Sequence, residues 1–195
     1  MNKILILGTS SFGGAATANF LLNKNFFVLG TYRRKKNPLY QPQLQNLKNK
    51  NFKDFKIDFD LDKDVSKIIK IIDKHKPKYI VDFASICMVS ESWDFPENYI
   101  KSNLEKKSIL IKKLCNKKFL KKYIYISTPE IFGSNKNSIK EDSNIFNPST
   151  PYAISKLAFE MMLKSYGTHY NFPYIICRFS NFFGTGQPNY RLVPK

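Results

Sequence analysis

The sequence is poor in the residues that build metal centres and disulfide frameworks. Its 195 residues include 2 histidines and 3 cysteines. Cys87, Cys115 and Cys177 are odd in number and far apart, so they predict neither a disulfide framework nor a metal-binding pair. With only two histidines, the sequence also gives little support for a Ser-His-Asp catalytic triad. We therefore expect a cytoplasmic protein without a metal site, in which Cys87 is a small buried side chain.

Long apolar runs and acidic residues are also scarce. The apolar run Ile4–Leu7 is too short to cross a membrane and lacks the pattern of a cleavable signal. Lys and Arg number 32 against 15 Asp and Glu, which gives a formal net charge of +17. The basic residues are spread along the chain without zinc-finger spacing or an RNP-type run. A lysine-rich composition explains the charge, and we expect neither a nucleic-acid nor a membrane partner.

Apolar runs of strand length alternate with amphipathic stretches of helical length, and 43% of the residues are apolar. Because strands that are apolar throughout are buried on both faces, the pattern predicts an α/β fold: a doubly wound parallel sheet with helices on both faces. The expected strands are Ile4–Leu7, Phe26–Leu29, Phe55–Ile57, Tyr79–Phe83, Tyr123–Ile126 and Tyr174–Cys177.

Two further stretches show helical spacing, and two are typical of loops. The helical positions are Val65, Ile68, Ile69 and Ile72, and then Ile100, Leu104, Ile111 and Leu114. Loops are expected at Asn37–Lys50 and Gly133–Pro148, which are rich in Asn, Pro, Gln and Ser.

The first strand runs into the sequence GTSSFGG and then into a helix. Gly8 permits a tight turn, the small Ser11 lets the backbone approach a pyrophosphate, and Gly14 allows close packing of helix and strand. The helix N-terminus favours an anion. The spacing resembles GxxGxxG with Ser in the middle place, which either tightens the turn or adds a hydroxyl contact. The predicted dinucleotide-binding residues are Gly8, Ser11, Phe12, Gly13 and Gly14.

The end of the second strand lacks the acid that would bind the adenosine ribose hydroxyls. The sequence there is GTYRRKK. Arg33 and Arg34 can instead pair with a 2′-phosphate. We therefore predict NADP as the cofactor, with NAD as the second choice.

The sequence PYAISK places Tyr152 and Lys156 four residues apart at the start of a helix, on one face. Thr150 is suited to cap this helix, with Pro151 at its first position. A tyrosine acting as a base must lose its proton, and its ordinary pKa is about 10. A nearby ammonium group stabilises the phenolate.

The fifth strand leads into STPEIFG, which places Thr128 and Glu130 where ligands bind in such sheets. Thr128 can form a hydrogen bond with a substrate hydroxyl or keto oxygen. Glu130 can take a proton from a carbon next to that keto group.

In this order the motifs resemble the extended short-chain dehydrogenase/reductase family, in its nucleotide-sugar epimerase/dehydratase branch, whose cofactor domain is a Rossmann fold. The resemblance covers essentially the whole chain. Its motifs are GTSSFGG, DFD (Asp58–Asp60), DFAS (Asp82–Ser85), STPEIFG, YAISK and RFSNFFGTGQ (Arg178–Gln187).

The resemblance implies a role for each matching residue. Tyr152 would be the catalytic base, with Lys156 as its electrostatic partner and ribose anchor, and Thr128 would lie beside the sugar O4. Departures from the family occur at Asp82, where a His is frequent, and at Cys87 and Ser90, where dehydratases often have Ser and Asp. The remaining implied contacts are Asp58 and Phe59 at the adenine, Phe83, Ala84 and Ser85 at the ribose and pyrophosphate, and Asn181 and Arg191 at the substrate.

The same resemblance implies a reaction that begins with oxidation of the sugar at C4. Glu130 favours a nucleotide-sugar 4,6-dehydratase, and the predicted NADP makes the GDP-mannose type the nearest chemistry. Pro129 stands where dehydratases of the family often have Asp or Ser, and it cannot donate a proton. A 4-epimerase, a UDP-glucuronate decarboxylase and a catalytically silent truncated cofactor-binding protein stay open as alternatives, as do the nucleotide and the sugar.

The resemblance also implies a domain division. Residues 1–180 would form the NAD(P)-binding domain and residues 181–195 the beginning of the substrate-binding region, with most of the C-terminal substrate domain missing. The helices at Ile100–Leu114 and Tyr152–Leu163 resemble those that pair in the family's four-helix interface, which implies a homodimer.

Overall fold

The computed structural model describes residues 2–34, 50–134, 138–184 and 187. The expected loop Asn37–Lys50 lies outside the described residues except for Lys50, and so does the expected substrate contact Arg191.

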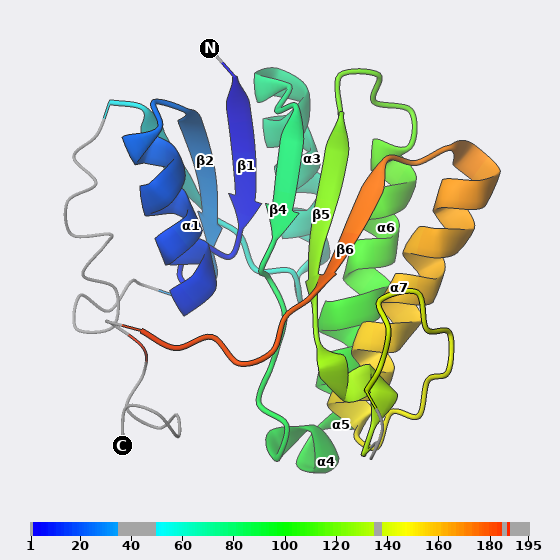
Figure 1. Cartoon of the computed structure of the whole chain (residues 1–195). Helices are drawn as coiled ribbons and strands as arrows, with labels where there is room; N and C mark the ends of the chain where they lie inside the picture. The colour runs from blue at the N-terminus through cyan, green and yellow to red at the C-terminus, as the bar shows by residue number, and fades with distance from the viewer. Residues whose placement is uncertain (1, 35–49, 135–137, 185–186, 188–195) are drawn as a thin grey trace.

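Six parallel strands form one sheet in the order β3-β2-β1-β4-β5-β6 (Figure 1). The predicted strands are all present, with ends that differ by at most three residues. Because the strand order reverses between β1 and β4, their carboxyl ends flank the switch point where α/β sheets bind ligands. The strands are β1 (Lys3–Leu7), β2 (Phe27–Tyr32), β3 (Phe52–Lys56), β4 (Tyr79–Asp82), β5 (Lys122–Ser127) and β6 (Tyr174–Arg178).

Helices cover both faces of the sheet, as predicted. On one face, Ile4, Ile6 and Val28 pack against Ala18 and Leu22 of α1 (Phe12–Asn23). On the other face, alternate strand residues pack against α3 (Asp62–His75), α6 (Lys106–Leu114) and α7 (Pro151–Tyr170) in a larger core. The alternation along each strand therefore separates two apolar layers, as expected of a doubly wound sheet.

The predicted helix Ile100–Leu114 is built from three consecutive pieces. They are α5 (Pro96–Ile100), the π-helical turn η2 (Lys101–Glu105) and α6, and the short α4 (Glu91–Asp94) precedes them. A π turn holds more residues than an α turn and so rotates the buried face. As a result Ile100, one of the residues that follow the helical spacing, is 40% exposed, whereas Asn103 and Lys107 are fully buried.

The start of α7 confirms its predicted cap. Thr150 accepts a hydrogen bond on Oγ1 from the backbone nitrogen of Ala153 at 3.1 Å, and Pro151 is the first helical residue. Near the middle of α7, the buried Glu160 accepts from Arg178 at the end of β6, with 2.8 Å between Nη2 and Oε2. These contacts fix both the register of α7 and its attachment to the sheet.

Within the described ranges no helix is long and apolar enough to span a membrane. The same ranges contain no group of three or more His, Cys, Asp or Glu side chains arranged to hold a metal ion.

Candidate nucleotide-binding and catalytic site

The loop between β1 and α1 is pinned to the end of β2. Gly8 donates its backbone N–H to Thr31 Oγ1 at 3.0 Å, and Thr9 donates its backbone N–H to the Thr31 carbonyl at 2.8 Å. Ser11 caps α1: its hydroxyl donates to the Gly8 carbonyl at 2.8 Å and accepts from the Gly14 nitrogen at 3.1 Å. The serine in the middle of the motif therefore tightens the turn, one of the two roles predicted for it.

The glycines of this loop are required because neighbouring protein atoms pack closely against them. Gly8 has φ +86°, and a Cβ there would lie 3.0 Å from the backbone nitrogen of Ala84. A Cβ at Gly14 would overlap the Gly8 carbonyl oxygen, and one at Gly13 would lie 2.7 Å from the Phe83 ring. The first turn of α1 contains no acidic residue, so its positive end suits an anion. These residues fit the pyrophosphate of a dinucleotide.

At the end of β2 the guanidinium of Arg33 binds two carboxylates. It lies 3.4 Å from Asp58 Oδ2 and 2.9 Å from Asp60 Oδ2, both on the segment after β3. Arg34 is exposed beside it, and the ring of Phe59 is buried in the core. The basic and acidic residues predicted from GTYRRKK and DFD thus lie at one corner of the carboxyl edge.

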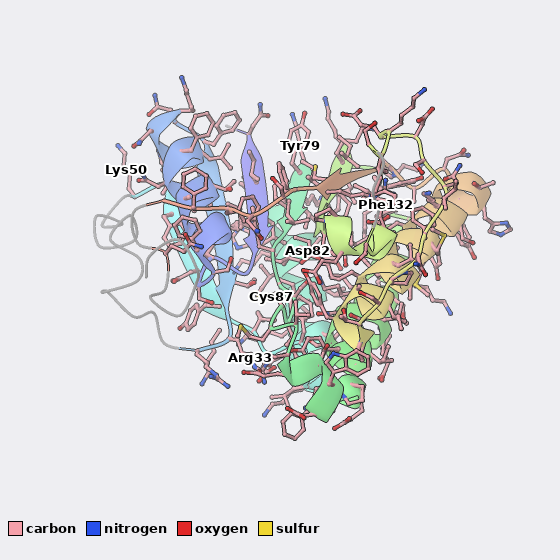
Figure 2. The ribbon with its side chains drawn as sticks, turned by 60° about the horizontal axis from the view of Figure 1, so that its bottom comes forward. Arg33, Lys50, Tyr79, Asp82, Cys87 and Phe132 are labelled. Atoms are coloured by element: carbon pink, nitrogen blue, oxygen red, sulfur yellow. The ribbon has the colours of Figure 1, made fainter. Side chains whose placement is uncertain are left out.

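At the end of β4 the fully buried carboxylate of Asp82 accepts three hydrogen bonds. The donors are Lys107 Nζ at 2.7 Å, Tyr123 Oη at 2.5 Å and the backbone nitrogen of Ala84 at 2.9 Å. Figure 2, turned to bring this edge forward, shows Asp82 near the centre of the molecule. Removing one partner of a buried ion pair costs about 3–5 kcal/mol, so this cluster fixes the end of β4.

The buried side chain of Lys156 reaches from α7 to the ends of β4 and β5. Its Nζ donates to Ser85 Oγ at 2.9 Å and to the Ile126 carbonyl at 2.7 Å, and it lies 4.3 Å from the centroid of the Tyr125 ring. Burial lowers the pKa of Lys156 to about 7, with the positive charge of Lys107 acting in the same direction. The predicted cofactor residue Ser85 therefore forms hydrogen bonds with lysine side chains.

One helical turn before Lys156, the buried Tyr152 lies with its ring in an edge contact with Tyr99, 6.3 Å between centroids. The backbone around Tyr152 is held by Ser155, whose hydroxyl donates to the Tyr152 carbonyl at 2.7 Å. Asn103 Nδ2 in turn donates to Ser155 Oγ at 3.1 Å. The predicted base and its lysine are thus both buried on one side of α7.

Thr128 and Glu130 follow directly after β5, as predicted. Thr128 is buried and accepts on Oγ1 from the Glu130 nitrogen at 3.3 Å, which caps the short 3₁₀ helix η3 (Pro129–Phe132). Lys156 contacts Ile126 of β5, so the carboxyl end of β5 and the helical turn from Tyr152 to Lys156 belong to one site. Asn181 is exposed beyond β6.

Sequence reasoning missed Asn103 and Lys107. Asn103 joins the loop after β4 to α7: it accepts from the Ile86 nitrogen at 2.9 Å and donates to the Ile86 carbonyl at 3.0 Å. The sequence gives no signal for the burial of Asn103, because the π turn that buries it has no clear sequence pattern. For Lys107 a signal was present. It continues the helical spacing of Leu104, Ile111 and Leu114, so the spacing places a lysine on the apolar face of the helix.

The expectation for Cys87 was wrong. Its side chain is exposed on the loop after β4, on the same edge as Asp82 (Figure 2). The strand ends at Asp82, so alternating burial does not extend to residue 87.

Comparison with known proteins decides the family. Residues 4–195 match the NAD dependent epimerase/dehydratase family. The chain belongs to this family. It is 31% identical over 214 residues to a dTDP-D-glucose 4,6-dehydratase from Dictyostelium discoideum, a match that covers 100% of this chain and 47% of the relative.

Solved structures of epimerases and dehydratases have the same fold. The UDP-glucuronic acid 4-epimerase from Bacillus cereus, in complex with UDP-glucuronic acid and NAD, is 27% identical with a TM-score of 0.82, covering 96% of this chain and 59% of the epimerase. DesIV, a dTDP-glucose 4,6-dehydratase from Streptomyces venezuelae, is 20% identical with a TM-score of 0.86. The match covers 98% of this chain and 60% of DesIV. This chain spans about half the length of the Dictyostelium relative.

The lowered pKa of Lys156 predicts a pH dependence of stability. Between its folded value of about 7 and the ordinary value of 10.5, the unfolded chain binds more protons than the folded chain, so the free energy of unfolding rises with pH. Urea unfolding from about pH 7 to about pH 9 should therefore show a smaller rise for Lys156→Met than for the original chain. Lys164→Met, on the same helix, is the control. If the free energy of unfolding changed equally with pH in the original chain and in Lys156→Met, the lowered pKa of Lys156 would be contradicted.

Proposed function

We propose that this chain contains the cofactor site and the catalytic side chains of an NAD(P)-dependent nucleotide-sugar 4,6-dehydratase. The observation that carries the proposal is the meeting of Tyr152–Lys156 with the end of β5, from which Thr128 and Glu130 follow. The likeness to the Dictyostelium 4,6-dehydratase supports it. In this proposal residues 1–180 hold the cofactor and residues 181–195 begin the substrate-binding region.

The side chains divide the reaction as follows. Bound NAD(P)⁺ would accept the hydride from C4 of the sugar and later return it to C6. Tyr152 takes the O4 proton, and the ammonium of Lys156 stabilises the resulting phenolate. Thr128 donates a hydrogen bond to O4. Glu130 takes the C5 proton of the 4-keto sugar. Since Pro129 carries no acidic proton, protonated Glu130 is the donor for the C6 hydroxyl, which leaves as water. C5 then takes up a proton from solvent.

A 4-epimerase is the second candidate. Its chemistry needs only the Tyr152 step and rotation of the 4-keto sugar, and the 27% identical Bacillus cereus relative is a UDP-glucuronic acid 4-epimerase. A UDP-glucuronate decarboxylase would share the same first step. A silent cofactor-binding protein would bind the dinucleotide without turnover.

The reaction is tested by incubating the chain and NAD(P)⁺ with dTDP-glucose, GDP-mannose and UDP-glucuronate in D₂O. We expect a 4-keto product that has lost water and carries deuterium at C5. Tyr152→Phe should lower turnover at least about a hundredfold, because the base is lost. Tyr170→Phe, an exposed tyrosine of α7, should not.

Product analysis by mass spectrometry separates the alternatives. Glu130→Gln should still oxidise C4 but lose little water. An epimer without loss of water would favour the 4-epimerase, and unchanged turnover in Tyr152→Phe would contradict the mechanism.

The proposed cofactor preference is for NADP and rests on Arg33 and Arg34. Asp58 and Asp60 already bind Arg33, so a 2′-phosphate must compete with two carboxylates for that guanidinium. Arg34 is exposed beside them and is the second phosphate contact in this proposal.

Fluorescence titration with NADPH and NADH tests this preference. NADPH should bind more tightly than NADH. Arg34→Ser should weaken NADPH binding about tenfold, the scale of one charge-assisted hydrogen bond, and should change NADH binding little. Lys24→Ser, at the far end of α1, is the control. Equal affinities of the original chain for the two cofactors would overturn the preference and leave NAD as the cofactor.

We also propose a homodimer through a four-helix interface. Exposed apolar side chains occur on both predicted helices, at Ile100 and Ile109 on one and at Ile154 and Met161 on the other. Sedimentation should show a dimer that Ile154→Asp dissociates. Phe20→Asp, on the opposite face of the sheet, should leave it intact. A monomeric original chain would contradict the interface.

A cytoplasmic location completes the proposal. It is supported by the three cysteines, none of which forms a disulfide in the structure.

A further inference from the structure

Two lysines from different helices meet at one hydroxyl group. Lys107 Nζ of α6 lies 3.0 Å from Ser85 Oγ, and Lys156 Nζ of α7 lies 2.9 Å from it. An ammonium group only donates hydrogen bonds, so the Ser85 oxygen accepts from both. The two nitrogens are therefore within about 6 Å of each other, close enough for strong electrostatic coupling.

Both lysines are buried, at 0% and 2% exposed, which is rare for this residue type. Lys107 is held by the Asp82 carboxylate at 2.7 Å and lies 5.1 Å from the Tyr125 ring centroid. Lys156 lies over the same ring. Packing alone does not account for this buried ion pair, because apolar side chains in place of both Lys107 and Asp82 would fill the space at similar or lower cost.

We propose that Lys107 is a positioning residue that acts through Lys156: anchored by Asp82, it fixes the Ser85 hydroxyl against Lys156 and places a second positive charge beside the Tyr152–Lys156 pair. This inference rests on the role proposed above for that pair. A second positive charge favours loss of a proton from Lys156 and favours the phenolate form of Tyr152.

Charged and titratable groups act on Lys156 from several elements. Burial is the main cause of its lowered pKa, and the charge of Lys107 on α6 is the next. Asp82 of β4, Cys87 of the following loop and Glu160 of α7 act in the opposite direction. Burial also lowers the pKa of Lys107 itself, and the charge and hydrogen bond of the Asp82 carboxylate act in the opposite direction.

The sign of each charge separates this proposal from a purely structural role. Lys107→Met removes the positive neighbour, so Lys156 should titrate at higher pH. Asp82→Asn removes a negative neighbour, so Lys156 should titrate at lower pH. If Lys107 only held the structure in place, both changes would remove the same Lys107–Asp82 contact, and there would be no reason for the Lys156 midpoint to shift in opposite directions.

The experiment is a pH titration of the chain with ¹³Cε-labelled lysine, followed by NMR without cofactor or substrate. The Lys156 signal is assigned by its absence in Lys156→Arg. We expect a midpoint of about 7 in the original chain. Lys107→Met should raise it by about one pH unit, and Asp82→Asn should lower it.

The matched control is Lys106→Met. Lys106 is also buried, but it faces Asp62 at 2.7 Å and Glu105 at 2.6 Å. Its removal should leave the Lys156 midpoint in place. The double variant Asp82→Asn/Lys107→Met avoids an unpaired buried charge if a single variant fails to fold. It should still raise the midpoint, because Lys107 acts on Lys156 more strongly than Asp82 does.

The proposal is overturned if the midpoint stays in place or falls in Lys107→Met, or in the double variant where the single one does not fold. It is also overturned if Lys107→Met and Asp82→Asn shift the midpoint in the same direction. Because the titration needs no substrate, it stands apart from the proposed function: absence of sugar turnover in the original chain would refute that function and leave the midpoints measurable. Where turnover occurs, the pH profile of kcat should move in the same directions.

Discussion

The buried carboxylate of Asp82 joins the parts of the molecule that make the site. It lies at the end of β4, paired with β1 on one side and β5 on the other, and it binds Lys107, Tyr123 and the Ala84 nitrogen. An unpaired carboxylate at this depth would be costly, so these groups are fixed relative to one another. The backbone at Ala84 passes directly against Gly8. One ion pair therefore holds both the phosphate loop and the lysine cluster in place.

The two halves of the candidate site have different physical foundations. The phosphate loop depends on close backbone approach at its glycines and on the Ser11 cap at the positive end of α1. The catalytic half depends on buried charge: Lys156 and Lys107 share Ser85 beneath the turn that carries Tyr152. A dinucleotide spanning the switch point would lie across both halves, which suits a reaction in which the sugar and the cofactor exchange a hydride.

The sequence allowed most of this arrangement to be predicted because its signals are local. Buried parallel strands, the glycine turn, the Thr150 cap and the Tyr152–Lys156 spacing each depend on a few neighbouring residues. Partners far apart in the sequence were not predictable: Arg33 with Asp58 and Asp60, or Ser85 between two lysines. The π turn changed the buried face at Ile100 and Asn103, since a single inserted residue alters the period on which the prediction relies.

Whether this site oxidises a nucleotide sugar at C4 is tested most directly by rapid mixing. The chain with bound NAD(P)⁺ is mixed with a nucleotide sugar, and the absorbance of reduced nicotinamide is followed through a single turnover. We predict that reduced cofactor appears and then decays as product forms, and that Tyr152→Phe abolishes the signal. If the cofactor binds but no reduced nicotinamide forms with dTDP-, GDP- or UDP-sugars, the proposed oxidation is contradicted.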